Sequence, residues 1–220
     1  MVYFISRILF AAILKIFFGL EVKGKENLPG GGPFILACNH VSHIDPVVVG
    51  VACNRLRVSF VAKKELFEIP IYRHWFRSMG CIKINRETGG SGALKEALFR
   101  LKKGGVVCIF PEGTRSKDGK LQEARPGVGL LVSRAGVPVI PVYVKGTGKV
   151  LPRGATRLKR AGVKIDIGRV IDISAGIRMS DKRKKYASIG AEIMNAIAEL
   201  SGNAGQGNGL PVGPERTPAR

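Results

Sequence analysis

The stretch PFILACNHVSHIDP, residues 33–46, decides the fold of this chain. Its first part, residues 33–38, is an unbroken apolar run, which is typical of a strand buried on both faces. Asp45 and Pro46 end the stretch. An aspartate followed by proline often starts a helix, because the carboxylate caps free amides and the ring suits the first helical position. A strand that turns into a helix predicts an α/β protein, in which ligands lie where the strands end.

The polar centre of the stretch places His40 five residues before Asp45. In a regular helix, side chains five positions apart point about 140° away from each other, so the two can meet only if the chain between them turns. A histidine held by a carboxylate has a fixed tautomer and a stabilised cation, which suits a general base. His40 and Asp45 are therefore the candidate catalytic residues.

Two other interpretations of these residues stay open. Asp45 alone could be only a helix N-cap, and a lone histidine is more often structural than catalytic. His40, His43 and Asp45 also offer a set of three zinc ligands. The chain has only 3 histidines, and its 4 cysteines are scattered through apolar segments, so we expect no metal. The same cysteine pattern points to a reducing compartment.

A second block, FPEGTRS at residues 110–116, completes the pattern. Together with NHVSHID at residues 39–45 it resembles the glycerolipid acyltransferase family, above all bacterial 1-acylglycerol-3-phosphate acyltransferases. Two shorter blocks agree, GCIKINR at residues 80–86 and VPVIPV at residues 137–142, and all four come in the family's order. The resemblance covers residues 20–175. Asn85 departs from the family's pattern, which often has aspartate there.

The resemblance implies transfer of a fatty acyl group from acyl-CoA or acyl carrier protein to the sn-2 hydroxyl of 1-acyl-sn-glycerol-3-phosphate (lysophosphatidic acid). The product would be phosphatidic acid, made in phospholipid biosynthesis, with no cofactor and no metal. His40 would be the base, oriented by Asp45. The resemblance assigns the following residues to the glycerophosphate acceptor or its neighbourhood: Lys63, Arg86, Glu112, Gly113, Thr114 and Arg115.

The residues themselves favour direct transfer without an enzyme nucleophile. Acyl transfer to an alcohol needs a base, and His40 supplies one. The nearest approach to a Gly-x-Ser-x-Gly elbow, GGSGA at residues 89–93, fails at its last position, and Ser91 suits a helix N-cap. Arg115 carries a planar donor fork that fits phosphate. An alternative is that Glu112 and Arg115 only pair with each other at a turn.

The chain of 220 residues carries 36 basic and 16 acidic side chains, a formal charge of +20. Such a charge predicts a polyanionic partner. We expect anionic membrane lipid and no nucleic acid, because no helix-turn-helix, zinc-finger or RNA-binding signature is present and the basic residues accompany apolar ones. A zinc hydrolase, a nucleic-acid-binding protein and an acyltransferase for another lyso-lipid remain the competing functions.

Residues 1–20 are apolar apart from Ser6, Arg7 and Lys15, and only 7 residues separate the two cations. On a helix the cations lie about 80° apart, so both can face one headgroup layer. This pattern predicts a helix that lies in the membrane interface, and a helix packed on its own domain or a tilted span are the alternatives. We expect a peripheral or monotopic protein on the cytoplasmic face of the inner membrane.

Strands and helices alternate along the remaining chain, which predicts a mixed, largely parallel sheet flanked by helices. The expected acyltransferase domain spans residues 21–200, and residues 201–220 form a disordered tail with little to bury. Strands are expected at 33–38, 58–62, 81–85, 106–110, 139–144 and, at a sheet edge, 163–173. Helices are expected at 46–54, 70–79, from Ser91 to about 103, 127–135 and about 186–200, with 21–32 a linker.

Overall fold

The computed structural model describes residues 2–53, 56–68, 80–84 and 90–202. Seven strands of this part form one sheet: β1 (Glu21–Lys23), β2 (Phe34–Cys38), β3 (Val58–Lys63), β4 (Ile82–Ile84), β5 (Val106–Ile109), β6 (Val139–Lys145) and β7 (Lys164–Ile167). Their order in the sheet is β1-β7-β6-β2-β5-β3-β4. All neighbouring pairs are parallel except β6 and β7. The expected mixed, largely parallel sheet is confirmed.

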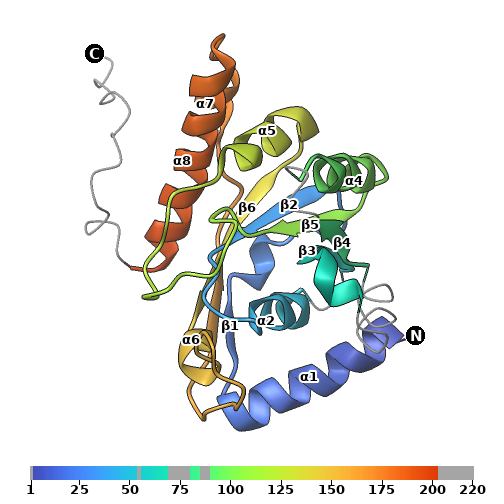
Figure 1. Ribbon diagram of the computed structural model, residues 1–220, viewed down its shortest axis with the longest axis vertical. Coiled ribbons are helices and arrows are strands. Elements are labelled where there is room, and N and C mark those ends of the chain that lie inside the picture. The colour runs from blue at the N-terminus through green and yellow to red at the C-terminus, as the bar shows by residue number, and fades with distance from the viewer. Residues whose placement is uncertain (1, 54–55, 69–79, 85–89, 203–220) are drawn as a thin grey trace.

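Helices cover both faces of the sheet (Figure 1). On one face lie α1 (Val2–Phe18) and α2 (Asp45–Ala52); on the other lie α4 (Ser91–Lys102), α5 (Pro126–Ala135) and α8 (Lys182–Leu200). Four short helices complete the described elements: 3-10 helices at Lys25–Asn27 and Lys64–Phe67, α6 (Thr147–Val150) and α7 (Ser174–Ile177). The two faces carry separate apolar clusters, so the sheet is buried from both sides.

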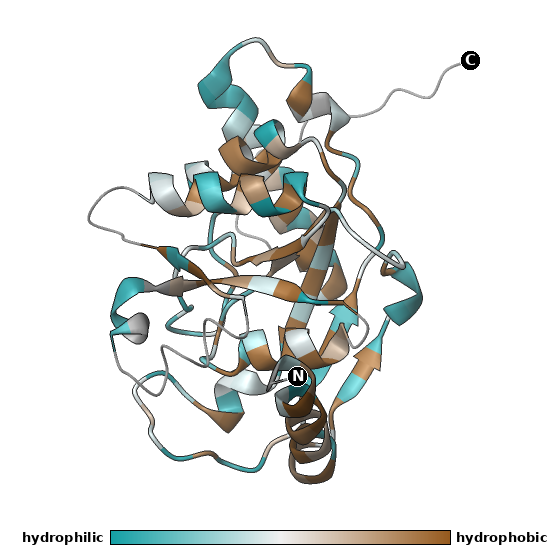
Figure 2. Ribbon diagram, turned by 90° about the vertical axis from the view of Figure 1, so that its right-hand side faces the viewer, coloured by the Kyte–Doolittle hydropathy of each residue, from teal (hydrophilic) through white to brown (hydrophobic). Residues whose placement is uncertain are grey.

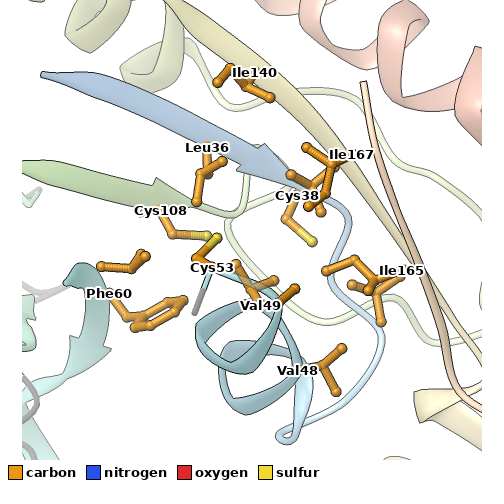
Figure 3. Packing of buried hydrophobic residues seen from close by; sticks show 14 of the residues in the cluster. Leu36, Cys38, Val48, Val49, Cys53, Phe60, Cys108, Ile140, Ile165 and Ile167 are labelled. Atoms are coloured by element: carbon orange, nitrogen blue, oxygen red, sulfur yellow. The ribbon is translucent and has the colours of Figure 1, made fainter. Parts of the chain in front are cut away.

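Strand β2 is the centre of this core, because all five of its side chains are buried and it pairs with β5 and β6. Its side chains alternate between the two apolar clusters. Figure 3 shows one of these clusters, to which Leu36 and Cys38 of β2 and Val48 and Val49 of α2 belong. The apolar run in the sequence is therefore a two-sided buried strand that leads straight to His40.

The first and last strands differ from the expectation. Residues 21–32 are not a linker throughout, since β1 forms the sheet edge and pairs in parallel with β7. Strand β7 is accordingly an inner strand, and it ends at Ile167 instead of continuing to residue 173. Strand β1 has only three residues, a half-buried valine between exposed Glu21 and Lys23. Such a short strand shows no periodic pattern, so the sequence did not predict it.

Two helix starts also differ. Gly90 is the residue that caps α4, with φ of 73°, and Ser91 is the first helical residue, so the expected serine N-cap is wrong by one position. Helix α8 begins at Lys182, where the Asp181 side chain accepts a hydrogen bond from the amide of Lys184. The expected helix at 70–79 lies outside the described residues, as does the tail from residue 203.

Helix α1 has two different apolar faces. One face packs on α2 and buries Tyr3, Leu14 and Phe18, and the Tyr3 hydroxyl donates to the carbonyl of Leu56 at 3.1 Å. The opposite face stays in solvent with its large side chains exposed: Phe4, Ile5, Ile8, Leu9, Ile16 and Phe17. Figure 2 shows this helix as strongly hydrophobic along its length. Among the described residues, no helix is long and apolar enough to cross a membrane.

The contact between α5 and α8 supports a prediction about stability. A methyl group on Gly129 would collide with the backbone of Tyr186, so Gly129→Ala must push the two helices apart. We expect this change to lower the free energy of unfolding by about 1–3 kcal/mol. A methyl group on Gly127, two residues earlier in α5, would have nothing within 4 Å. Gly127→Ala is the matched control.

Urea unfolding of the two variants beside the wild type measures this difference. Gly127→Ala is expected to leave stability unchanged or raise it by up to about 1 kcal/mol, because alanine favours a helix. Equal stability of the two variants would contradict the close packing of α5 on α8.

Candidate active site

The end of β2 is fixed to its neighbour before the chain reaches His40. Asn39 is buried, its side-chain amide donates to the carbonyl of Val144 at 3.0 Å, and its side-chain oxygen accepts from the Val144 amide at 2.7 Å. The two bonds continue the pairing of β2 with β6 by one more residue. His40 therefore starts the turn from a rigid position at the carboxyl end of the central strand, where α/β proteins bind ligands.

Asp45 holds this turn closed. Its Oδ2 atom accepts hydrogen bonds from His40 Nδ1 and from the amides of Val41 and Ser42, each at 2.8 Å. Asp45 is itself the first residue of α2, and the side chain of a helical residue points back toward the N-terminus. The expectation that Asp45 caps the helix amides is thus wrong. It binds the amides of the preceding turn, and Ile44 occupies the cap position without a side-chain bond.

The imidazole of His40 is set up to accept a proton. Because the Asp45 carboxylate can only accept at Nδ1, the ring proton lies there and Nε2 keeps its lone pair. The Asp45 side chain is fully buried, whereas the His40 side chain is 17% exposed. The ring of Phe110 stacks on the imidazole with a centroid distance of 4.0 Å and an angle of 21° between planes. The aspartate and the phenyl ring together fix the orientation of the imidazole.

The FPEGTRS block lies directly beside His40. After β5 the chain turns sharply, with the Gly113 amide donating to the carbonyl of Phe110 at 2.9 Å. Gly113 has φ of 67°, a conformation that favours glycine, and a methyl group there would lie 2.9 Å from the Arg125 side chain. This loop is bound to the His40 turn, because the Ser116 amide donates to the carbonyl of His40 at 2.8 Å. Two loops that are far apart in sequence form one site.

Glu112 binds the backbone of the His40 turn. Only 1% of Glu112 is exposed, and its Oε1 atom accepts from the amide of His40 at 2.8 Å. Burial raises the pKa of Glu112 to about 7, against the opposing effect of that amide and the amide of Gln122, while the charge of Asp45 raises it further. Direct binding of the acceptor by Glu112 remains a prediction. The contact with His40 favours a role in positioning the base.

Arg115 lies half-buried in the same loop, where burial and the charge of Arg153 lower its pKa and the charge of Asp45 raises it. Among the ion pairs of the described residues there is none between Arg115 and Glu112, so the alternative of an isolated pair is wrong. Thr114 is half-buried beside it. For Lys63 only the backbone is described, at the end of β3, and Arg86 lies outside the described residues. The binding roles of these residues stay predictions.

The described residues hold no group of three or more His, Cys, Asp or Glu side chains that could bind a metal ion. His43 is exposed, while the carboxylate of Asp45 is buried and bound to the turn. Cys38 lies near the site but is fully buried, and burial raises the pKa of its thiol well above the ordinary value. It is therefore a core residue and not a nucleophile.

Sequence reasoning missed several parts of this site. Phe110 was expected only to end a strand, although an aromatic residue just before the Pro-Glu-Gly turn was the available signal. The Ser42 hydroxyl donates to the carbonyl of Leu151 at 2.8 Å, and Arg153 reaches the carbonyl of Arg115 at 3.2 Å. These two contacts bring the segment after α6 to the site, and no motif in the sequence marks that segment.

Comparison with known proteins agrees with this geometry. The sequence model of the family described as Acyltransferase matches residues 19–145, a range that contains both the His40 turn and the Glu112 turn. A chloroplastic 1-acyl-sn-glycerol-3-phosphate acyltransferase from Brassica napus is 30% identical over 200 residues, which cover 89% of this chain and 57% of that protein. The chain spans about half the length of the chloroplastic relatives it matches, with 57% and 53% covered.

A bacterial relative matches over nearly its whole length. The 1-acyl-sn-glycerol-3-phosphate acyltransferase of Bacillus subtilis is 28% identical over 195 residues, covering 88% of this chain and 94% of that protein. Among solved structures, the 1-acyl-sn-glycerophosphate acyltransferase PlsC of Thermotoga maritima superposes with a TM-score of 0.74 at 28% identity. The match covers 90% of this chain and 79% of that one.

Proposed function

The chain belongs to the acyltransferase family, and from this premise we propose that it transfers a fatty acyl group to the sn-2 hydroxyl of 1-acyl-sn-glycerol-3-phosphate, giving phosphatidic acid. The donor would be acyl-CoA or acyl carrier protein. Relatives named for this acceptor from a plant and a bacterium support the assignment, as does the PlsC structure. The observation that carries it is the imidazole of His40, held by Asp45 at Nδ1 with Nε2 left to take a proton.

In the proposed mechanism, His40 Nε2 removes the proton from the sn-2 hydroxyl as its oxygen attacks the thioester carbonyl. The new ester bond forms while the carbon–sulfur bond breaks, and the imidazolium returns the proton to the departing thiolate. The buried carboxylate of Asp45 stabilises the imidazolium in between. A base held in this way typically contributes about 10²–10⁴-fold to the rate. No step requires a metal ion or another cofactor.

The acceptor's phosphate would lie against cationic side chains near the turn. Arg115 follows Gly113 and Thr114 in the loop that is bound to His40, and its planar fork suits phosphate oxygens. The family resemblance adds Arg86 and Lys63 to this phosphate site. Binding the headgroup through several donors would hold the adjacent glycerol carbon near His40, and such positioning lowers the entropic cost of the reaction.

The exposed face of α1 suits a membrane surface, which is where both the acceptor and the product would reside. Six large apolar side chains on this face are in solvent: Phe4, Ile5, Ile8, Leu9, Ile16 and Phe17. The opposite face is fixed to α2, so a bilayer that covers α1 also orients the domain. We place the protein at the cytoplasmic face of the inner membrane, held there by α1 and by attraction of its +20 charge to anionic lipid.

An acyl-transfer assay tests the proposed function. The purified protein would be given acyl-CoA or acyl carrier protein thioester as donor, with lysophosphatidic acid, lysophosphatidylcholine, lysophosphatidylglycerol or monoacylglycerol as acceptor. Lysophosphatidic acid is expected to be the fastest acceptor, with the new ester at sn-2. Faster transfer to another lyso-lipid would replace the acceptor, and the absence of transfer to all four would refute the proposal.

A single substitution on α1 tests the membrane assignment. Leu9→Glu places a charge in the middle of the exposed apolar face without touching the face that packs on α2. We expect weaker binding to vesicles that contain anionic lipid, because a carboxylate on this face opposes burial in the acyl boundary. Vesicle flotation measures the bound fraction.

The matched control is Lys182→Gln, which lowers the net charge by the same single unit at the start of α8, at the far end of the molecule from α1 (Figure 1). The control is expected to bind like the wild type. If both variants lost the same fraction of binding, net charge alone would hold the protein on the membrane and α1 would not be the anchor.

A further inference from the structure

The segment after α6 lies against the site through two contacts with different loops. The carbonyl of Leu151 accepts from the hydroxyl of Ser42 in the His40 turn at 2.8 Å. Two residues later, Nη1 of Arg153 donates to the carbonyl of Arg115 at 3.2 Å. This segment therefore spans from the catalytic turn to the loop that carries Arg115, and it brings the guanidinium group of Arg153 to that loop.

The contact between Arg153 and the Arg115 loop brings two positively charged residues together. Burial lowers the pKa of Arg115, the charge of Arg153 lowers it further, and the charge of Asp45 raises it. In the part of the chain that the structure describes, neither arginine forms an ion pair with a carboxylate. The nearby carboxylate of Asp45 binds the His40 turn through its Oδ2 atom. Two cations held together without an ion pair to a carboxylate favour an anion between them.

We infer that Arg153 is a second ligand for the acceptor's phosphate and binds it together with Arg115. The inference rests on the function proposed above and adds a residue outside the four sequence blocks of the family. A phosphate monoester carries a charge of about −1.5 to −2 at neutral pH, whereas a phosphodiester headgroup carries about −1. A pair of arginines therefore discriminates between lysophosphatidic acid and lyso-lipids whose phosphate is esterified again, because only the monoester offers three free oxygens.

Kinetics of Arg153→Ala test this role. Hydrogen bonds to charged groups are strong enough that losing one is expected to raise KM for lysophosphatidic acid by about 10- to 100-fold. The value of kcat should change little, because Arg153 holds the headgroup and not the reacting atoms. Arg153→Lys keeps the charge without the planar fork, so an intermediate KM is expected. The preference for lysophosphatidic acid over lysophosphatidylcholine should fall in Arg153→Ala.

The matched control is Arg157→Ala, which removes an exposed arginine four residues further along the same segment. Its KM is expected to stay near the wild-type value, which excludes a general effect of charge. Equal KM values for the two alanine variants would overturn the inference and leave the proposed function intact.

A binding measurement separates the inference from the proposed reaction. Titration of lysophosphatidic acid in neutral detergent micelles into each full-length variant gives the affinity without any acyl transfer. A loss of affinity in Arg153→Ala but not in Arg157→Ala supports the phosphate site even if the wild type transfers no acyl group to this lipid. Equal affinities of Arg153→Ala and Arg157→Ala for lysophosphatidic acid would overturn the role of Arg153 in phosphate binding, even if the wild type transfers an acyl group to this lipid.

Discussion

Replacing His40 by alanine is expected to lower kcat for acyl transfer by about 10²–10⁴-fold, the contribution typical of a positioned base. Without the imidazole, the sn-2 hydroxyl must attack while it still carries its proton. KM for the acceptor should change little, because the phosphate is held by other residues. Initial rates at varied acceptor concentration give both constants, and a thermal unfolding curve checks that the variant is folded.

His43→Ala provides the control for this experiment. His43 lies three residues further on in the same turn, with an exposed side chain. We expect it to keep a kcat within a few-fold of the wild type. If both histidine variants lost activity equally, a mechanism that uses the two together would be favoured, as in a zinc hydrolase. Full activity of His40→Ala would refute His40 as the base.

Asp45→Asn separates the geometry of the turn from its charge. The amide oxygen of asparagine can still accept from the three donors now bound to Oδ2. The other carboxylate oxygen, Oδ1, is buried without a hydrogen-bond partner, so replacing it by an NH₂ group breaks no hydrogen bond among the described residues. A fall in kcat in a folded Asp45→Asn protein would therefore report the lost charge next to the imidazolium.

The sequence could predict the His40–Asp45 pair because both residues lie within one short segment. A buried strand, a polar turn and an Asp-Pro helix start are local features, and each depends on residues near one another in the chain. The resemblance to the family, which rests on the four blocks and their order, added the Arg115 loop to the predicted site. The sheet class followed from strands that alternate with helices, although β1, with three residues, left no periodic signal.

What the sequence could not predict are contacts between distant segments. The bond from the His40 amide to Glu112 joins residues 72 positions apart, and the bond from Ser42 to Leu151 joins residues 109 positions apart. Residue spacing carries no information about such pairs, because they depend on which strand ends meet in the sheet. For this reason no sequence pattern indicated the hydrogen bond between Glu112 and the His40 amide, and the acceptor-binding role that the resemblance assigns to Glu112 stays a prediction.

The buried position of Glu112 leads to a prediction about pH. Its pKa is raised from 4.5 to about 7 in the folded protein, so between these values the folded state keeps a proton that the unfolded chain releases. The contribution of Glu112 to the free energy of unfolding is therefore fully present below pH 4.5 and is lost as the pH rises through about 7. The glutamine of Glu112→Gln cannot ionise, so this variant should lose a pH-dependent change of about 3 kcal/mol in the free energy of unfolding.

Urea unfolding of the wild type and Glu112→Gln across this pH range measures the effect as the difference between the two proteins, in which the other titrating groups cancel. The wild type is expected to lose stability relative to the variant as the pH rises. Glu123→Gln, at an exposed carboxylate in the same region, is the matched control and should show no such trend. A constant difference for Glu112→Gln would mean that Glu112 ionises as freely in the folded protein as in the unfolded chain.

The same variants decide what Glu112 does in catalysis. The amide oxygen of Glu112→Gln can still accept from the His40 amide, so kcat should be largely retained. Glu112→Ala removes the acceptor and lets the turn shift, and a displacement of about 1 Å can cost on the order of 10²-fold in rate. A positioning role predicts this loss in kcat with KM nearly unchanged. A large rise in KM in both variants would instead show that the carboxylate binds the acceptor.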